Sequence, residues 1–207
     1  RMAELTATRM YGSLDDILAD SNVETVVNLT NPRDHFETTR QCLEAGKHVY
    51  TEKPLAMEFS LAAELVELAE KRGLILSSAP CTLLNEAAQT LWKAVRERPI
   101  GEIRLVYAEM EDGMVHRMPV KQWVNEAGTP WPYIDEFEIG CTVEHAGYVL
   151  TWLAAMFGPA ESVSAFSACI APDKTPGESL HPAPDLSVAA IRFRSGVVAR
   201  MTNGIYA

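Results

Sequence analysis

The sequence lacks several features that would indicate particular classes of protein. No uninterrupted apolar run approaches the roughly 18 residues of a membrane-spanning helix. The four cysteines lie far apart and form no C-x-x-C pair, so neither a zinc site nor a disulfide framework is predicted. Basic residues are also few. The sequence contains 18 Lys and Arg residues and 28 Asp and Glu residues. The resulting net charge of -10 argues against nucleic acid or an anionic membrane surface as a partner.

The rest of the composition is that of an ordinary globular protein. Of the 207 residues, 47% are hydrophobic and 22% are charged, which suits one large domain or two small ones. Residues 1–4 lack the apolar core of a signal peptide. We therefore expect a reduced, cytoplasmic protein. The negative charge does not argue against small neutral molecules as ligands.

Predicted strands and helices alternate over the first 80 residues. Ser13 is placed to cap a short helix, Asp34 and Glu37 have capping-box spacing at the start of a second, and Gly46 and Gly73 are placed to end two helices. Three apolar runs have the composition of buried parallel strands: residues 23–29, 49–51 and 74–76. This alternation predicts an α/β fold with a parallel sheet and right-handed crossovers.

From residue 81 onward the pattern changes to longer strands. Asn85 is placed to cap a helix that ends before Pro99, and residues 140–158 form a helix that is apolar on nearly every side and is expected to be buried. Four runs have strand composition: residues 103–110, 163–170, 186–193 and 197–201. Because residues 194–196 read as a tight turn between the last two, we expect an open, mainly antiparallel sheet.

The segment Glu52-Lys53-Pro54 directly follows the strand predicted at residues 49–51. In open α/β sheets ligands bind at the carboxyl ends of strands, where the loops diverge. A lysine desolvated in such a crevice exchanges a proton near neutral pH, and Pro54 excludes Lys53 from the helical conformation. The alternative interpretation is a surface lysine beside a turn proline.

Four polar or aromatic side chains share one stripe of the helix predicted over residues 140–158: Cys141, His145, Tyr148 and Trp152. A histidine on a buried helix needs a hydrogen-bonding partner. His145 is therefore either a catalytic group or a core histidine satisfied by a backbone carbonyl.

Acidic and aromatic residues precede this helix. Asp135, Glu136 and Glu138 form an acidic cluster, but no second His or Cys stands at ligand spacing, so no metal site is predicted. Tyr133 is a candidate hydrogen-bond donor to a substrate oxygen. Aromatic rings such as that of Trp131 either stack on sugar faces or simply pack a loop.

Two segments carry a resemblance to a known family: residues 31–36 (NPRDHF) and 42–54 (CLEAGKHVYTEKP). Their order and spacing resemble the glucose-fructose oxidoreductase and inositol dehydrogenase (Gfo/Idh/MocA) family, and the resemblance extends from about Tyr11 to the end of the chain. Members are two-domain enzymes that use a nicotinamide cofactor, mostly on sugars and cyclitols. The resemblance implies an incomplete Rossmann-type domain in residues 1–80 and an incomplete α+β domain for substrate binding and oligomerisation in residues 81–207.

The resemblance also implies roles for individual residues. Hydride would pass between a polyol carbon and NAD or NADP, while the hydroxyl proton passes to Lys53 or His145. Cofactor contacts are expected from six residues: Asn31, Pro32, His35, Glu52, Lys53 and Pro54. Substrate contacts are expected from five: Tyr133, Glu138, Cys141, Glu144 and His145. Cys141 stands where the family carries an aspartate, so the acid of a proton relay would come from Glu138 or Glu144, unless these are solvated helix termini.

One element of a dinucleotide site is absent from the sequence. Such a site needs a G-x-G-x-x-G turn, which occurs nowhere in the 207 residues. A βαβ unit takes roughly 30 residues, and only 12 precede Ser13. We expect either a fragment of an NAD(P)-dependent oxidoreductase, weak or inactive alone and homo-oligomeric through its C-terminal sheet, or an inactive ligand-binding or assembly module of the same fold.

Overall fold

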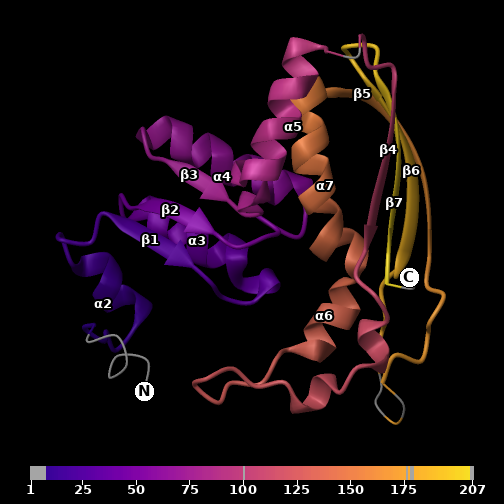
Figure 1. Cartoon of the computed structure of the whole chain (residues 1–207). Coiled ribbons are helices and arrows are strands. Elements are labelled where there is room, and N and C mark those ends of the chain that lie inside the picture. Colours follow the sequence, from indigo (N-terminus) through magenta and orange to yellow (C-terminus); the bar gives the residue numbers. More distant parts are fainter. Residues whose placement is uncertain (1–7, 100, 176, 178–179, 206–207) are drawn as a thin grey trace. The chain divides into compact units, whose positions relative to one another are not determined.

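The structure is a computed structural model that describes residues 8–99, 101–175, 177 and 180–205. The chain divides into two compact units (Figure 1). The first comprises Arg1–Ala79 with Val124–Thr129, and the second comprises Pro80–Trp123 with Pro130–Ala207. Within the described part of the chain, no helix is long and apolar enough to cross a membrane.

The first unit is built on a three-stranded parallel sheet of order β1-β2-β3. Helices lie between successive strands, as the alternating sequence pattern predicts (Figure 1). Its elements are α2 (Leu14–Ala19), β1 (Thr25–Asn28), η1 (Pro32–Asp34), α3 (His35–Glu44), β2 (His48–Thr51), α4 (Phe59–Arg72) and β3 (Leu76–Ser78). The predicted parallel sheet is confirmed.

A small apolar cluster holds the helices of this unit to the sheet. Leu43 from α3, Val49 from β2 and Leu65 from α4 are each at most 1% exposed. Burying side chains of this size stabilises the fold by about 1.5–3 kcal/mol each. The two helices end as predicted, at Gly46 and Gly73, whose φ angles of 79° and 66° are readily adopted only by glycine.

Two local predictions in the first unit are wrong. The Asp34 side chain makes no capping hydrogen bond, because the 3₁₀ turn before α3 already holds Asp34 in helical conformation, with φ -92° and ψ -9°, instead of the extended one a cap requires. Glu37 pairs with Arg40 instead. The third strand begins at Leu76, two residues later than expected, because the Leu74 amide still donates to the Ala69 carbonyl at the end of α4.

The second unit contains a four-stranded sheet of order β4-β7-β6-β5. Its strands are β4 (Leu105–Glu111), β5 (Ala160–Ala168), β6 (Leu186–Phe193) and β7 (Val198–Gly204). The β6–β7 hairpin is confirmed, with the Gly196 amide bonded to the Phe193 carbonyl in its turn. The sheet is mixed, because β4 runs parallel to β7 whereas the other two pairings are antiparallel.

Helix α7 packs on one face of this sheet (Figure 1). Leu153 and Phe157 of the helix meet Ile191 and Ala199 of the sheet in one buried cluster. The expectation that α7 is buried all round is wrong, since Leu150 is 41% exposed. Helix α7 comprises Cys141–Phe157, and the other helices of this unit are η2 (Cys81–Leu84), α5 (Glu86–Glu97), η3 (Val115–Arg117), η4 (Val120–Gln122) and α6 (Tyr133–Ile139).

Candidate active site

A buried asparagine organises the turn that follows β1 in the first unit. The Asn28 side chain is 2% exposed, and its Oδ1 accepts from the Thr30 amide at 3.2 Å and the Thr30 hydroxyl at 2.8 Å. Its Nδ2 donates to the Thr39 hydroxyl at 3.1 Å and the His35 carbonyl at 3.3 Å. Asn28 therefore fixes both ends of the turn that contains Asn31 and Pro32. Sequence reasoning missed it, although a polar residue near the end of an apolar run is a readable signal.

His35 joins this turn to the loop that follows β2. Its ring Nδ1 lies 2.7 Å from the Pro54 carbonyl oxygen and its Nε2 lies 2.9 Å from the Thr30 carbonyl oxygen. The Lys53-Pro54 peptide bond is cis. On the other side of Lys53, the Glu52 amide donates to the Asn28 carbonyl at 2.9 Å. The backbone on either side of Lys53 is thus tied to the turn after β1.

Five of the six residues predicted to contact a cofactor lie in these two segments, at the carboxyl ends of β1 and β2, and the sixth, His35, is the first residue of α3. Asn31 is exposed, Pro32 and His35 are buried, and Glu52, Lys53 and Pro54 are partly buried. The carboxylate of Glu52 accepts from the Lys53 amide at 3.1 Å. The first unit therefore gathers one acid and one base at the edge of the sheet where ligands bind in open α/β folds.

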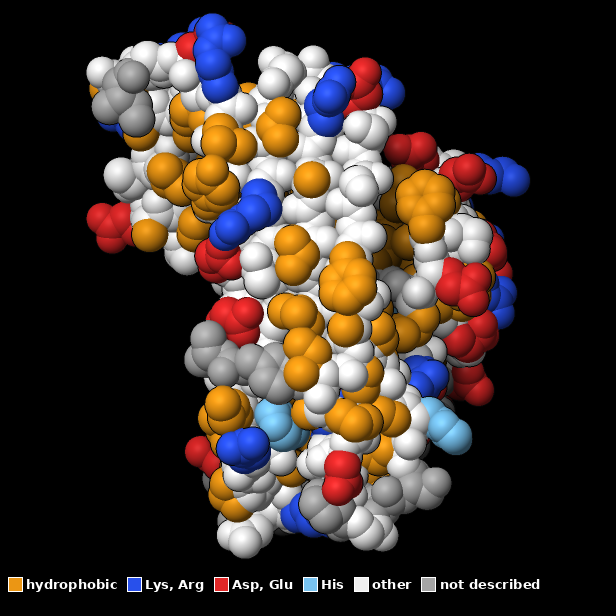
Figure 2. Space-filling model, turned by 90° about the vertical axis from the view of Figure 1, so that its right-hand side faces the viewer, with side chains coloured by type: hydrophobic (Ala, Val, Ile, Leu, Met, Phe, Trp, Pro, Cys, Tyr) orange, Lys and Arg blue, Asp and Glu red, His pale blue; other side chains and the backbone are white. Residues whose placement is uncertain are grey.

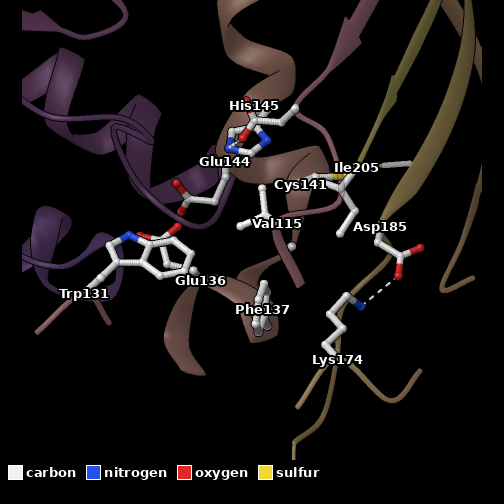
Figure 3. Close-up of a pocket in the computed structure, with 12 residues that line it drawn as sticks. Val115, Trp131, Glu136, Phe137, Cys141, Glu144, His145, Lys174, Asp185 and Ile205 are labelled. Carbon is white, nitrogen blue, oxygen red and sulfur yellow. Dashed lines mark ion pairs between the residues drawn. The ribbon is translucent and has the colours of Figure 1, made fainter. Parts of the chain in front are cut away.

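The second unit contains a cavity of about 50 Å³ at the N-terminal end of α7 (Figure 3). Of the five predicted substrate residues, Cys141, Glu144 and His145 line this cavity, whereas Tyr133 and Glu138 do not. The remaining lining residues are Asp112, Val115, Trp131, Glu136, Phe137, Gly140, Lys174, Asp185 and Ile205. In Figure 3 the Glu144 carboxylate points towards the side of Trp131, away from Lys174.

His145 has a carboxylate partner that the sequence did not indicate. Its Nε2 lies 3.5 Å from Oδ2 of Asp112, which directly follows β4. The histidine side chain is 22% exposed and the aspartate side chain 44%. A carboxylate at this distance stabilises the imidazolium that forms when His145 takes up a proton. Because 33 positions separate the two residues in the chain, only the pairing of β4 within the sheet brings them together.

Cys141 provides no acidic group at the cavity. The residue is 5% exposed, and its backbone carbonyl accepts from Asn203 Nδ2 at 3.0 Å. Burial and, secondarily, the negative charge of Asp185 raise the pKa of the Cys141 thiol to about 11. The thiol is therefore neutral at physiological pH, and a carboxylate that pairs with His145 is that of Asp112.

The raised pKa of Cys141 predicts a specific loss of stability at high pH. A thiol ionises more readily in the unfolded chain, so its contribution is fully present below pH 9 and is lost as the pH rises towards 11. Between pH 8 and pH 11 the free energy of unfolding should fall by about 1–3 kcal/mol more in the wild type than in Cys141→Ser, which cannot ionise. Urea denaturation at each pH measures the difference. Equal losses in both proteins would contradict the assignment.

A buried ion pair lies on the other side of the cavity. Lys174 Nζ is 2.8 Å from Asp185 Oδ2, and each side chain is 1% exposed. Asp185 also accepts from the backbone amides of Ile170, at 2.7 Å, and Ala171, at 3.0 Å. Sequence reasoning did not identify either residue of this pair. A lysine and an aspartate 11 positions apart in a loop carry no pattern that predicts their burial.

Removing one partner of this pair should strongly destabilise the second unit. We expect Lys174→Met to lower the free energy of unfolding by about 3–5 kcal/mol, because the buried Asp185 carboxylate then loses the positive charge 2.8 Å away. The double variant Lys174→Met/Asp185→Leu should lose less. Lys93→Met is the matched control, since Lys93 forms a pair with Glu97 that is more than 60% exposed on both sides. Urea denaturation measures all three, and a Lys174→Met loss no larger than the control would contradict the prediction.

The corner between α6 and α7 closes the cavity through backbone contact. Gly140 has a φ of 81°, and a Cβ at this position would lie 2.6 Å from Ala183 Cβ and 2.7 Å from the Pro184 carbonyl oxygen. The Ala183 amide also donates to the Phe137 carbonyl at 3.2 Å. The segment before β6 therefore lies directly against this corner.

Among the described residues, no group of three or more His, Cys, Asp or Glu could hold a metal ion.

Comparisons with known proteins relate parts of the chain to one family. Residues 1–79 match the Gfo/Idh/MocA model, described as an oxidoreductase family with an NAD-binding Rossmann fold. An uncharacterized oxidoreductase of Schizosaccharomyces pombe is 45% identical over 95 residues, which cover 46% of this chain and 26% of the relative. Trans-1,2-dihydrobenzene-1,2-diol dehydrogenase of Macaca fascicularis is 30% identical over 120 residues, covering 58% of this chain and 36% of the relative.

A solved structure matches the whole chain. The WlbA dehydrogenase from Chromobacterium violaceum, crystallised with NADH and UDP-GlcNAcA, superimposes with a TM-score of 0.77 and 26% identity, and the match covers 100% of this chain and 56% of the WlbA chain. The chain thus spans between a quarter and three fifths of the relatives compared. Residues 1–79 therefore match the NAD-binding Rossmann model of the Gfo/Idh/MocA oxidoreductase family, and the two sheets have the fold of that family.

Proposed function

We propose that this chain carries the nicotinamide and substrate sites of an NAD(P)-dependent oxidoreductase that acts on a sugar, cyclitol or related polyol. The observation that supports the proposal best is the position of Glu52-Lys53-Pro54. These residues lie at the carboxyl end of β2, within the segment that matches the NAD-binding family. Strand ends of this kind are where open α/β sheets bind dinucleotides.

The residues of the first unit fit the nicotinamide end of a cofactor. Asn31, Glu52 and Lys53 are at least partly exposed, and their loops are held by Asn28 and His35. The 207 residues contain no glycine-rich turn for the pyrophosphate. We therefore assign only the nicotinamide-side contacts to this chain. When bound, the nicotinamide accepts the hydride that leaves the carbinol carbon.

The chain's own residues would accept the proton that the substrate hydroxyl group releases. As the carbinol carbon loses hydride, its hydroxyl group releases a proton to Lys53 or His145, whichever is neutral before the step. His145 is suited to hold a proton because Asp112 lies 3.5 Å from its Nε2. Cys141 takes no part in the relay, because its pKa is raised to about 11 by burial.

The cavity of the second unit favours a hydroxyl-bearing substrate. Glu144 and His145 present polar atoms to it, and Trp131, held 6.1 Å from the Phe137 ring centroid, presents an aromatic ring. A volume of about 50 Å³ is small beside the 300–1,000 Å³ common for ligand sites. We therefore expect the cavity to receive one end of the substrate. The sugar nucleotide in the WlbA crystal and the diol named for the macaque relative are both compatible with a cyclic, hydroxyl-bearing substrate class.

A homo-oligomer through the sheet of the second unit is part of the proposal. The face turned away from α7 carries Leu105, Tyr107, Phe166 and Val198, which are 37–65% exposed. Hydrophobic side chains gather on the surface shown in Figure 2. Exposed apolar patches commonly mark protein interfaces. Sedimentation velocity on the purified protein measures the state, and a strictly monomeric protein would remove this element of the proposal.

Two measurements test the central proposal. Calorimetric titration with NAD and with NADP should detect binding by the complete gene product and weak or no binding by the 207-residue chain. Absorbance of the reduced cofactor should then rise on at least one member of a panel of sugars and cyclitols. The competing function is a ligand-binding or assembly module of the same fold, which is favoured by the absence of a phosphate-binding glycine turn from the sequence. If the complete protein binds neither dinucleotide, the result would support the binding or assembly module and contradict the proposed oxidoreductase function.

A further inference from the structure

His35 makes a pair of contacts that a neutral histidine cannot satisfy. Its Nδ1 and Nε2 lie 2.7 Å and 2.9 Å from two backbone carbonyl oxygens, those of Pro54 and Thr30. A carbonyl oxygen only accepts hydrogen bonds, and a neutral imidazole carries a proton on only one of its nitrogens. Both contacts are hydrogen bonds only if both ring nitrogens are protonated.

We infer that His35 is an imidazolium that clamps the loop after β1 to the loop after β2, and that it is a positioning residue for Lys53. The inference rests on the proposed function in so far as it gives Lys53 a part in proton transfer. The clamp itself follows from the contacts of His35 alone. It differs from the direct cofactor contact predicted from the sequence, because the residue is 1% exposed and both ring nitrogens face the protein backbone.

The surrounding network explains why the clamp is fixed. Asn28 holds the Thr30 amide and hydroxyl through its Oδ1, and donates to the backbone carbonyl of His35 itself through its Nδ2. The Thr30 carbonyl and the His35 backbone are therefore set by one buried side chain. In the neutral form, one ring nitrogen would present a lone pair to a carbonyl oxygen at less than 3 Å, a separation that leaves no room for a water between them.

A positive charge at this place also has a cost, which the two hydrogen bonds must offset. His35 is the first residue of α3, where the helix dipole and the unpaired amides disfavour a cation. Hydrogen bonds in which the donor is charged are about twice as strong as neutral ones. Two such bonds to fixed carbonyls are therefore the feature that can keep the ring charged.

The clamp bears on Lys53 because it acts on the adjacent residue. The Pro54 carbonyl bonded to His35 belongs to the residue that follows Lys53, and the Glu52 amide bonded to the Asn28 carbonyl belongs to the residue that precedes it. Lys53 is thus held between two fixed points. A loss of the His35 contact would free one side of the loop, and a displacement of about 1 Å in a catalytic group costs on the order of 10²-fold in rate.

The protonation state can be read directly, without any activity. Nitrogen-15 labelling of the five histidines in the 207-residue chain, followed by two-dimensional NMR of the rings at pH 7.5, separates imidazolium from neutral imidazole. The signal that disappears in His35→Phe should show a proton on both nitrogens. A ring with one unprotonated nitrogen would overturn the imidazolium. This result does not depend on whether the protein is an oxidoreductase.

Kinetics on the complete protein then test the positioning role. His35→Asn retains one amide donor and should lower kcat by about 10- to 100-fold, while the dissociation constant for the cofactor changes less than about twofold. His48→Asn is the matched control, because the His48 ring also bonds backbone, accepting from the Ile75 amide at 2.9 Å, but lies away from the Lys53 loop. Its kcat should be unchanged.

The outcomes separate the two hypotheses. A His35→Asn enzyme that keeps wild-type kcat, or one whose kcat falls only in proportion to its folded fraction measured by circular dichroism, overturns the positioning role. A wild-type protein that binds no nicotinamide cofactor overturns the proposed function and with it the role of Lys53, while the NMR result still decides the clamp. If His35→Asn does not fold, the ring signal of the wild type decides the clamp, and the kinetics of His35→Gln, whose amide can donate to only one of the two carbonyls and should also lower kcat, decide the positioning role.

Discussion

Lys53→Ala is expected to lower kcat by about 10²–10⁴-fold on whichever polyol gives the highest rate, with a smaller effect on the affinity for the cofactor. The size follows from the usual contribution of one positioned acid or base to a proton transfer. The Lys53 backbone is fixed through Glu52 and Pro54, so the loss should come from the missing ammonium group and leave the loop in place. Steady-state kinetics and calorimetric titration of the cofactor measure the two effects separately.

Two further variants decide what kind of role Lys53 has. Lys53→Arg keeps a positive charge but cannot release a proton near neutral pH, so it should be almost as inactive as Lys53→Ala. Lys71→Ala, at an exposed lysine at the end of α4, should be neutral. Full turnover by Lys53→Ala would remove the lysine from the mechanism, and full turnover by Lys53→Arg would reduce it to a fixed charge.

The second large effect is expected at His145. His145→Gln should lower kcat by about 10²-fold, because the amide cannot take up or release the proton that the imidazole carries. Asp112→Asn, which removes the charge 3.5 Å from Nε2 and keeps the size of the side chain, should lower kcat by about 10-fold. The pH dependence of kcat, followed by absorbance of the reduced cofactor, should change in both variants.

His181→Gln provides the comparison for His145. The same substitution is made at an exposed histidine outside the cavity, so kcat and its pH profile should both stay as in the wild type. If Asp112→Asn matches the wild type while His145→Gln is inactive, the carboxylate does not support the histidine. Wild-type rates in His145→Gln would mean that the cavity at α7 is not where the proton is exchanged.

Local sequence patterns predicted the elements that carry most of the fold. Gly46 and Gly73 ended helices as expected, and Ser13 and Asn85 cap α2 and α5, accepting from the Asp16 and Ala88 amides. These signals work because each depends on the conformation of one residue and its immediate neighbours. The capping box at Asp34 failed for the same local reason, since the 3₁₀ turn before α3 had already placed Asp34 in helical conformation.

The partners of the site residues could not be predicted in the same way. Lys53, His145 and Cys141 were identified from residue type and resemblance, but the contacts of His35 and His145 come from residues 19 and 33 positions away. Lys174 and Asp185 are buried as a pair although they lie 11 positions apart in a segment without periodicity. Pairing of this kind is set by the topology of the strands, which a single sequence does not contain.

The close packing at Gly140 limits how the second unit can change over evolution. Any larger residue there would have to push Ala183 and Pro184 outward, and Asp185, which follows them directly, would be carried away from Lys174. Because glycine is already the smallest residue, adaptation to a bulkier substrate cannot come from a substitution at this corner. It would have to proceed through trimming of the apolar side chains of Val115 or Phe137, which line the same cavity without holding the backbone together.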